Sequence, residues 1–470
     1  MNFIIITKIE LKKNYLTVLY ELIKTKMKKP IFIILIFNAL ILSGQNKEYF
    51  NFEEALKSPN EVEVLTISED IYNLPKEIIQ FKNLRELNLL RTIFDEFPKE
   101  IFELSNLEKI YINAKINAFY EIPDKFNQLT NLTEFSITNI HTNRDTLFPE
   151  SFYQLSNLKK LEVWAPNFPK RELDLLSSSF DLHTLNLSGT LLWVIPESFS
   201  KFQNIEVLIL HNCHIEYEKR HEHSIKVVGL ERLTSLKVLD LSDNYFKQFP
   251  IEILNLKLLE ELHLEKNRIE VIPKNIENLK NLKYLYLGCN PFESFPKEVY
   301  ALKSLKELSI NGKGIGDLMD MKIMLEIPNG ISNLENLEKL DMSNFSFLQH
   351  LPNDIVKLKK INYIDISYNP SLLSLNELNE IPSLKYINLM HINKLSTKLN
   401  YSFTNNIKTI IIDETISAEL QNEFKKKCNN CDLKVKFDND INWYIGYDCS
   451  EISRDRIRNY SNNLKYYDEK

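Results

Sequence analysis

The sequence has little glycine, few cysteines and no strong excess of charge of either sign. Nine glycines among 470 residues, together with 44% hydrophobic residues, exclude a disordered chain over most of the length. A formal net charge of −6 gives no sign of a nucleic-acid-binding protein, which would be basic. The phosphate-loop motif G-x-x-x-x-G-K-[ST] does not occur, and no Ser/His/Asp, Cys/His or paired-carboxylate constellation stands out. We therefore expect no enzymatic activity, no cofactor and no nucleic-acid partner.

A leucine phrase, L-x-x-L-x-L, recurs about every 23 residues from Val62 to Ile412. Within each copy the last two leucines alternate with polar residues, which is the period-two pattern of a half-buried strand. A unit this short cannot bury its apolar face alone, so neighbouring units must stack into a solenoid with one continuous core. About fifteen copies can be counted, opening at Val62, Leu84, Leu107, Leu132, Leu158, Leu182, Ile205, Leu236, Leu259, Leu282, Leu305, Leu337, Ile361, Leu384 and Ile407.

The clearest unit, residues 258–280, reads LLEELHLEKNRIEVIPKNIENLK. It resembles the leucine-rich-repeat family, in the subtype shared by plant disease-resistance proteins, Ras-pathway scaffolds and many bacterial surface proteins. The resemblance implies an α/β solenoid: a horseshoe with a parallel β-sheet on the concave face, an irregular or short-helical convex side, and a cap at both ends. It also implies that the chain is an interaction module.

The same resemblance implies a ladder of asparagines after the strands, whose side chains satisfy backbone groups in the bend. The ladder positions that fit the family are Asn244, Asn267, Asn290 and Asn369, with Cys213 as the usual substitute. Because other turns lack asparagine, we expect repeats 2 to 6 to be less regular. The departures are Thr92, Lys115, Ile140, Pro166, Thr190, Lys313, Phe345 and Ile392.

The chain divides into five expected segments. Residues 1–44 form a leader, 45–61 an N-terminal helical cap, 62–412 the repeats, 413–437 a C-terminal helix–strand cap and 438–470 a loosely ordered tail. From Met27 the leader reads MKKPIFIILIFNALILSGQ, the order of charge, apolar run and small residues that is typical of a signal peptide. This order favours 27–44 as a signal peptide and an exported, bacterial protein. The alternatives are an uncleaved membrane anchor and a cytoplasmic signalling scaffold.

Two repeats are longer than the others, and their loops at 214–229 and 311–327 could carry recognition. The first holds a run of histidines, His211, His214, His221 and His223, for which a metal or pH-sensing site has to be weighed. We favour ordinary buried and loop histidines, and expect no metal site.

Five cysteines are present. Cys213 and Cys289 occupy repeat positions at which a small buried apolar residue is expected. A disulfide involving Cys428, Cys431 and Cys449, free thiols, and a metal site remain open, although the local sequence offers no histidine as a further ligand.

Strand alternation identifies the residues that point outward on the concave face. Acids outnumber bases there, ten to three: Glu86, Glu134, Glu162, Asp240, Glu261, Glu265, Glu307, Asp341, Asp365 and Asp413 against Lys109, Lys160 and Lys339. The candidate partner-binding residues are Tyr111, Trp164, His211, Glu261, His263, Glu265, Tyr284, Tyr286, Tyr363 and Tyr386. Tyrosine and tryptophan are common interface anchors, so we expect a protein or a glycan as ligand. We further expect a monomer that meets a membrane only through an uncleaved leader.

Overall fold

The computed structural model describes most of the repeat region and both ends of the solenoid. The described residues are 47–94, 96–114, 122–138, 140, 145–166, 168–215, 229–292, 294–312, 327–345, 348–392, 407–413, 416–427 and 432–436. The expected leader (1–44) and tail (438–470), and most of the two long loops, lie outside this part of the chain. Its helices are too short or too polar to cross a membrane.

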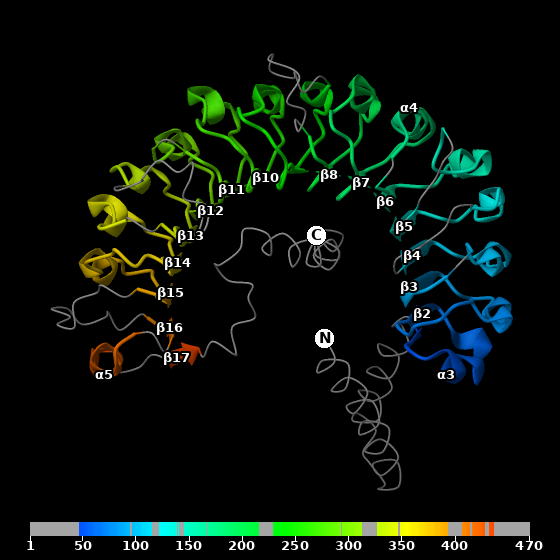
Figure 1. Cartoon of the computed structure of the whole chain (residues 1–470), viewed down its shortest axis with the longest axis horizontal. Coiled ribbons are helices and arrows are strands. Elements are labelled where there is room, and N and C mark those ends of the chain that lie inside the picture. Colours follow the sequence, from blue (N-terminus) through cyan, green and yellow to red (C-terminus); the bar gives the residue numbers. More distant parts are fainter. Residues whose placement is uncertain are drawn as a thin grey trace, which may run out of the picture.

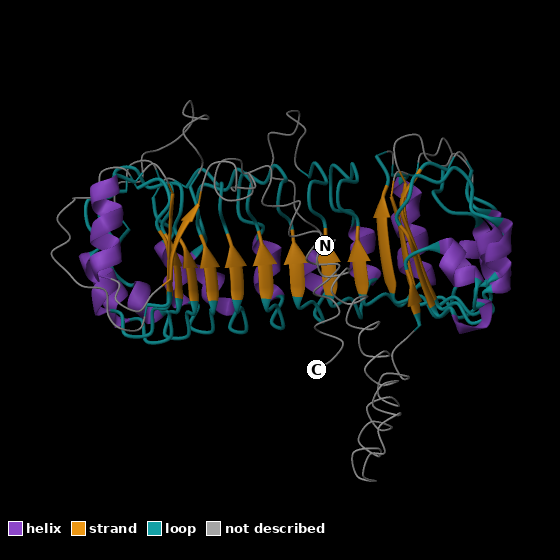
Figure 2. Ribbon diagram, turned by 90° about the horizontal axis from the view of Figure 1, so that it is seen from below, coloured by secondary structure: helices purple, strands orange, loops and turns teal. Residues whose placement is uncertain are grey.

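The described strands form one parallel sheet of 17 strands, in which each strand pairs with its neighbours in the sequence. The sheet lines the inside of a horseshoe and does not close on itself (Figures 1 and 2). The predicted fold class is therefore confirmed. The strands are β1 Glu48–Tyr49, β2 Val64–Ile67, β3 Glu86–Thr92, β4 Lys109–Ala114, β5 Glu134–Thr138, β6 Lys160–Trp164, β7 Thr184–Asn186, β8 Val207–Ile209, β9 Val238–Asp240, β10 Glu261–His263, β11 Tyr284–Tyr286, β12 Glu307–Ser309, β13 Lys339–Asp341, β14 Tyr363–Asp365, β15 Tyr386–Asn388, β16 Thr409–Asp413 and β17 Asp432–Lys436.

Short helices return the chain along the convex side (Figure 1). Most are 3₁₀ helices preceded by proline, whose fixed φ and missing N–H suit this position. They are η1 Pro59–Glu61, η2 Lys76–Gln80, η3 Lys99–Glu103, η4 Phe126–Gln128, η5 Glu150–Gln154, η6 Glu197–Lys201, η7 Leu230–Arg232, η8 Ile251–Asn255, η9 Lys274–Asn278, η10 Lys297–Ala301, η12 Ile331–Asn333, η13 Asn353–Lys357 and η14 Asn376–Glu380. Three α-helices are described, α3 Phe52–Leu56, α4 Lys170–Ser179 and α5 Ala418–Lys427.

The asparagine ladder holds the bends after the strands, as expected. Asn267 accepts a hydrogen bond from the backbone N–H of Phe246 (3.1 Å) and donates to the carbonyls of Leu241 (2.9 Å) and Leu264 (3.0 Å). Each ladder asparagine thereby joins its own turn to the preceding repeat. Cys213 takes the same place, and its thiol donates to the Leu187 carbonyl at 3.1 Å.

Strand length changes between β6 and β7. From β7 to β15 the strands have three residues, whereas β3 has seven, β4 six, and β5 and β6 five each. Thr92, Ile140 and Pro166 stand at the ladder positions of three repeats with longer strands. However, Thr190, Phe345 and Ile392 do so after three-residue strands, so the missing asparagine alone does not set strand length. The β3–β4 pair also has a register shift between Leu90 and Thr92. The irregularity expected of repeats 2 to 6 thus takes the form of longer strands in repeats 2 to 5, whereas repeat 6, which contains β7, has an ordinary three-residue strand.

The two ends are closed in different ways. At the N-terminal end β1 pairs with β2, Ala55 is buried, and the Phe52 ring packs edge-on against Phe81 at 5.5 Å. Phe50, in the same N-terminal segment, is 42% exposed. At the C-terminal end α5 buries Phe424, and β17 pairs with β16.

Cysteine chemistry differs from expectation at one position. Cys213 is free and buried, whereas Cys289 is disulfide-bonded. Both side chains are buried, as predicted, but the disulfide at Cys289 was not predicted. Cys428, Cys431 and Cys449 lie outside the described residues.

Candidate functional site

The concave face is built from short strands in strict register. In each three-residue strand the central residue is buried in the core, as Leu262 and Leu285 are, and its two neighbours point away from the core. Parallel pairing without offsets aligns these neighbours in two rows. The first row is Glu261, Tyr284, Glu307, Lys339, Tyr363 and Tyr386; the second row is Asp240, His263, Tyr286, Ser309, Asp341, Asp365 and Asn388.

A buried charged centre lies on β10 and β11. The Nε2 atom of His263 is 2.7 Å from Glu261 Oε1, and Nδ1 is 3.3 Å from Glu265 Oε1. The imidazole is stacked on the Tyr286 ring, with centroids 4.3 Å apart and planes inclined by 17°. Burial disfavours the charged imidazole, but Glu265, Glu261 and Asp240 outweigh burial and raise the pKa of His263 to about 10. His263 is therefore an imidazolium at neutral pH.

A second acidic centre lies on β13 and β14. Asp365 accepts hydrogen bonds from Ser367 Oγ (2.6 Å), from Asn388 Nδ2 (2.8 Å) and from the Tyr363 hydroxyl (3.1 Å). Burial and the charge of nearby Asp341 raise the pKa of Asp365 to about 6. The side chains that hold these two carboxylates are polar and uncharged, so the pair keeps most of its negative potential.

The N-terminal half of the face is closer to neutral. Glu134 accepts a hydrogen bond from the Tyr111 hydroxyl and forms ion pairs with Lys109 and with Lys160 (3.8 Å). Burial opposes ionisation of Glu134, but the hydrogen bonds from Lys109 and Tyr111 outweigh it, so the pKa of this carboxyl is lowered. Lys160 also lies 3.2 Å from Glu162 and 5.8 Å from the centre of the Tyr111 ring.

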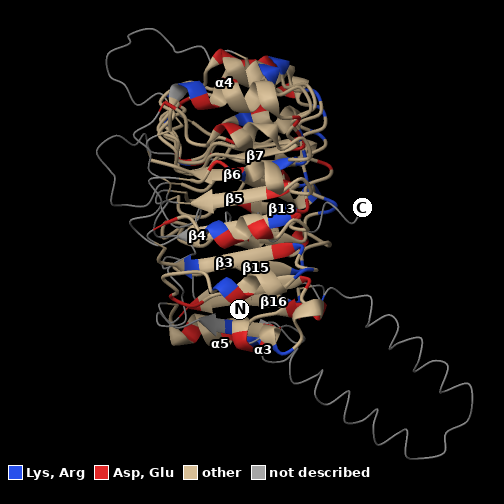
Figure 3. Ribbon diagram, turned by 90° about the vertical axis from the view of Figure 1, so that its right-hand side faces the viewer, with Lys and Arg blue, Asp and Glu red and all other residues tan. Residues whose placement is uncertain are grey.

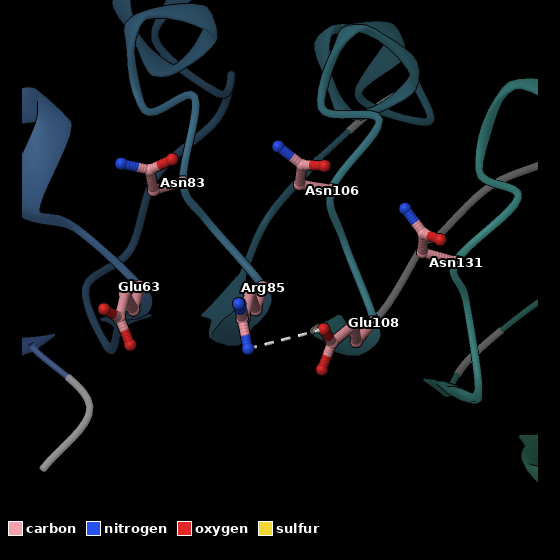
Figure 4. Close-up of a pocket in the computed structure, with 6 residues that line it drawn as sticks. All are labelled: Glu63, Asn83, Arg85, Asn106, Glu108 and Asn131. Atoms are coloured by element: carbon pink, nitrogen blue, oxygen red, sulfur yellow. Dashed lines mark ion pairs between the residues drawn. The ribbon is translucent and has the colours of Figure 1, made fainter. Parts of the chain in front are cut away.

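A polar hollow lies at the rim where the strands begin. It has a volume of about 270 Å³ and is lined by Glu63, Asn83, Arg85, Asn106, Glu108 and Asn131 (Figure 4). Arg85 lies 3.8 Å from Glu108, and the three asparagines stand in line, one per repeat. An open hollow without an apolar wall is a poor site for an enclosed small molecule.

These rim asparagines form a second ladder that the sequence reading missed. Asn83 Nδ2 donates to the Asn60 carbonyl at 2.7 Å and Asn106 Nδ2 to the Lys82 carbonyl at 2.8 Å, and Asn281 makes the same bond to Lys257 at 2.8 Å. The sequence does contain a pattern for this second ladder, because an asparagine directly precedes the first leucine of many leucine phrases, as Asn83 precedes Leu84. The rim also pairs opposite charges of successive repeats, for example Lys237 with Glu206 and Lys283 with Glu260, each at 2.8 Å. Acidic and basic positions are accordingly interspersed along the stack (Figure 3).

Comparisons with known proteins agree with this geometry. A family model described as "Leucine-rich repeat region" matches residues 181–314. A leucine-rich-repeat protein of Leptospira interrogans superposes with a TM-score of 0.53 at 26% identity, covering 83% of this chain and 100% of that one. This chain is a leucine-rich-repeat protein.

Other relatives share only part of their length or only the fold with this leucine-rich-repeat protein. An Arabidopsis thaliana protein named for disease resistance is 28% identical over 217 residues, which is 40% of this chain and 17% of the relative. The disease resistance protein UNI of the same plant is 34% identical over 65 residues, or 14% and 7%. An internalin of Listeria monocytogenes has a TM-score of 0.50 at 19% identity, covering 71% of this chain and 88% of its own. The chain thus spans less than a fifth of the length of these plant relatives.

The structure separates the ten candidate residues of this leucine-rich-repeat protein by exposure. Trp164 and Tyr386 are exposed, at 38% and 39%. Tyr111, Glu261, Tyr284 and Tyr363 are half-buried, and His211, His263, Glu265 and Tyr286 are buried. Glu261, His263, Glu265 and Tyr286 are brought together in one cluster, with Tyr284 paired opposite Glu261. Tyr111 and Trp164 lie several strands away, on β4 and β6.

His211 lies apart from that cluster, in the turn after β8. Its Nδ1 atom is 2.9 Å from Ser242 Oγ, and its Nε2 atom is 3.9 Å from Asp243 Oδ2. No group of three or more potential metal ligands occurs within the described residues, which include His211 and His214. His221 and His223 lie outside them, as do Gly314 and Gly316 of the other long loop.

Proposed function

We propose that this leucine-rich-repeat protein is a non-enzymatic interaction module that binds a protein partner on its concave face. The observation that carries the proposal is the first row of the face, in which Tyr284, Tyr363 and Tyr386 stand in line with the charged side chains of Glu261, Glu307 and Lys339. Tyrosine supplies large contact area at low conformational cost and is a frequent interface anchor. Held by register, these side chains offer a pre-ordered surface.

The charge of the face favours a partner with a basic segment. Acidic residues outnumber basic ones on the part of the concave face that β9–β16 form. The basic residues of the two rows there are Lys339 and the charged His263. The acids there are Asp240, Glu261, Glu265, Glu307, Asp341, Asp365 and Asp413. Such a surface attracts lysine and arginine and repels phosphates. One solved neighbour, TLR13 at 18% identity and a TM-score of 0.53, is in complex with single-stranded RNA, but the acidic face here argues against that class of ligand.

Binding can be tested with a lysine-rich peptide and a glutamate-rich peptide of equal length. We expect saturable binding of the first, weakened by salt, and no binding of the second. Tyr284→Ala combined with Tyr386→Ala should weaken binding about tenfold or more. Tyr286 is left intact because it packs on His263. The matched control is Tyr72→Ala, which removes a 62%-exposed tyrosine away from the strands. Equal affinity for both peptides, or an unchanged affinity in the double variant, would refute the proposal.

We further propose that the protein is exported and bacterial. The leader sequence supports export, and the Leptospira and Listeria neighbours support a bacterial source. The alternative is an intracellular scaffold of the same repeat subtype. Cell fractionation with N-terminal sequencing decides between them. A new N-terminus near Gln45 outside the cytoplasm supports export, whereas an intact cytoplasmic chain supports the scaffold.

A further inference from the structure

Two bulky residues on the flank of the solenoid have an unusual backbone. Positive φ angles recur in the described turns at the residue just before most ladder positions, as at Asp243 (54°) and Lys266 (56°). Among the described non-glycine residues, two positive φ angles fall elsewhere: Trp193 at 64° and His214 at 56°. Left-handed backbone is strained for large side chains, and such strain concentrates at functional sites.

These two residues touch each other and begin a row of rings. The Trp193 and His214 rings meet edge to face, with centroids 5.6 Å apart and planes inclined by 63°. His214 meets Tyr245 at 5.7 Å and 51°, and the Arg268 guanidinium lies 4.8 Å from the centre of the Tyr245 ring. We call Trp193, His214, Tyr245 and Arg268 the aromatic edge. It runs across four successive repeats beside the ends of β7–β10.

The backbone beneath the aromatic edge is fixed. The N–H of Trp193 donates to the Cys213 carbonyl at 3.3 Å, and that of Tyr245 donates to the Ile215 carbonyl at 3.0 Å. Asn244 Oδ1 accepts from Cys213 N (3.0 Å) and from Ile215 N (3.1 Å), so the backbone of His214 is held on both sides. The rings are therefore ordered before any ligand arrives, which lowers the entropic cost of binding.

Both tryptophans of the described region lie at this side of the molecule, and both side chains are unusually exposed to solvent. Trp193 is 39% exposed, and Trp164 is 38% exposed with its Nε1 atom donating to the Gly189 carbonyl at 3.1 Å. Gly189 begins the turn that leads to Trp193. Tryptophan is normally among the more buried residues. Two exposed indole rings near one turn therefore indicate a ligand-binding surface.

We propose that the aromatic edge binds a glycan, at a site separate from the concave face. A pyranose ring presents C–H bonds on its faces, which the negative face of an aromatic ring attracts, and hydroxyls on its rim. The rings are inclined to one another and are interleaved with the polar turn residues Asn212, Asp243 and Lys266. The amide, carboxylate and ammonium groups of these turn residues lie beside the rings and can form hydrogen bonds with the hydroxyls of a sugar.

The test uses the full chain with two probes, a hexamer of β-1,4-linked N-acetylglucosamine and a hexamer of β-1,4-linked glucose, titrated by calorimetry. We expect saturable binding of at least one. Trp193→Asn and Tyr245→Ala should each weaken it on the order of tenfold. Asparagine tolerates left-handed backbone, so Trp193→Asn should leave the free energy of unfolding unchanged or raised.

The control is Tyr386→Ala, which removes an equally exposed ring (39%) from the concave face and should leave glycan affinity unchanged. Absence of saturable binding to both hexamers overturns the proposal. Binding that survives Trp193→Asn and Tyr245→Ala also overturns it, as does binding that Tyr386→Ala abolishes. The peptide experiment uses other probes and substitutes residues of the concave face, whereas Trp193→Asn and Tyr245→Ala change the aromatic edge alone. Failure of the glycan site therefore leaves the concave-face proposal standing, and the reverse holds.

Discussion

His263 and Tyr286 form a stacked pair at the middle of the concave face, 4.3 Å between ring centres, and Glu261 and Glu265 hold the two nitrogens of the imidazole. The sequence placed all four side chains on the surface as contact residues. In the structure they are ordered mainly by one another, so the partner is expected to meet a rigid base rather than four independent side chains.

Replacing His263 should destabilise the solenoid strongly. His263→Asn removes the buried cation and leaves Glu261, Glu265 and Asp240 facing each other, at an expected cost of about 3 kcal/mol or more. Chemical denaturation of the purified variant gives the value. The exposed ion pair of Lys237 with Glu206 serves as comparison, because Lys237→Ala should cost about 1 kcal/mol or less. Equal effects of the two substitutions would contradict the assigned role of His263.

The raised pKa of His263 predicts how the stability of the fold depends on alkaline pH. The pKa of His263 is raised from its ordinary 6.5 to about 10, so its stabilising contribution is complete below 6.5 and is lost as pH rises through 10. In that window each pH unit should lower the free energy of unfolding by about 1.4 kcal/mol at most. Denaturation curves at pH 7, 8 and 9 should show the fall in the natural chain and a smaller one in His263→Asn.

Sequence periodicity sufficed for the horseshoe, because each leucine phrase fixes one buried strand and the repeat fixes its neighbours. It did not predict which outward side chains stay accessible. His211, His263, Glu265 and Tyr286 sit at outward positions, yet neighbours from adjacent repeats bury them. Which side chains shield one another depends on contacts between repeats, and single-repeat patterns do not contain these. The left-handed backbone of Trp193 and His214 left no sequence signal for the same reason.

Glu172 predicts a second pH effect, in the acidic range. This carboxylate, in the first turn of α4, is fully buried and accepts hydrogen bonds from Leu147 N (2.5 Å) and the Tyr153 hydroxyl (2.7 Å). Burial raises its pKa from 4.5 to about 6. A raised carboxyl pKa stabilises the fold below the unfolded pKa, and this contribution is lost as pH rises through the folded value. The loss should amount to about 2 kcal/mol between pH 4.5 and 6.

Glu172→Gln should remove that part of the pH profile while keeping the shape of the side chain. The control is Glu197→Gln, at an exposed glutamate in the next repeat, whose profile should match that of the natural chain. If Glu172→Gln loses as much stability between pH 4.5 and 6 as the natural chain does, burial of the Glu172 carboxylate is not the cause of that loss.

Gly189→Ala should disturb the Trp164 side chain. Gly189 has φ +74°, and a Cβ there would lie 2.7 Å from Trp164 Nε1, closer than real contacts allow. The substitution combines left-handed strain with a steric clash, for which about 1–2 kcal/mol of destabilisation is expected. Indole fluorescence should shift toward that of a more solvated ring. A variant with natural stability and an unshifted spectrum would show that the close approach is absent in solution.

The two asparagine ladders should differ sharply in energetic importance, although both join successive repeats. Asn267→Ala leaves the buried N–H of Phe246 without a partner. It also takes one amide bond each from the carbonyls of Leu241 and Leu264, which keep their bonds from Asn244 and Asn290. The substitution should cost about 1–3 kcal/mol. Asn281→Ala removes one exposed bond to the Lys257 carbonyl and should cost about 1 kcal/mol or less, because water replaces the lost partner. Since each repeat is stabilised only by its neighbours, hydrogen exchange in Asn267→Ala should accelerate first in the repeats on either side of Asn267. Uniform acceleration along the whole solenoid would instead indicate that the repeats unfold as one cooperative unit.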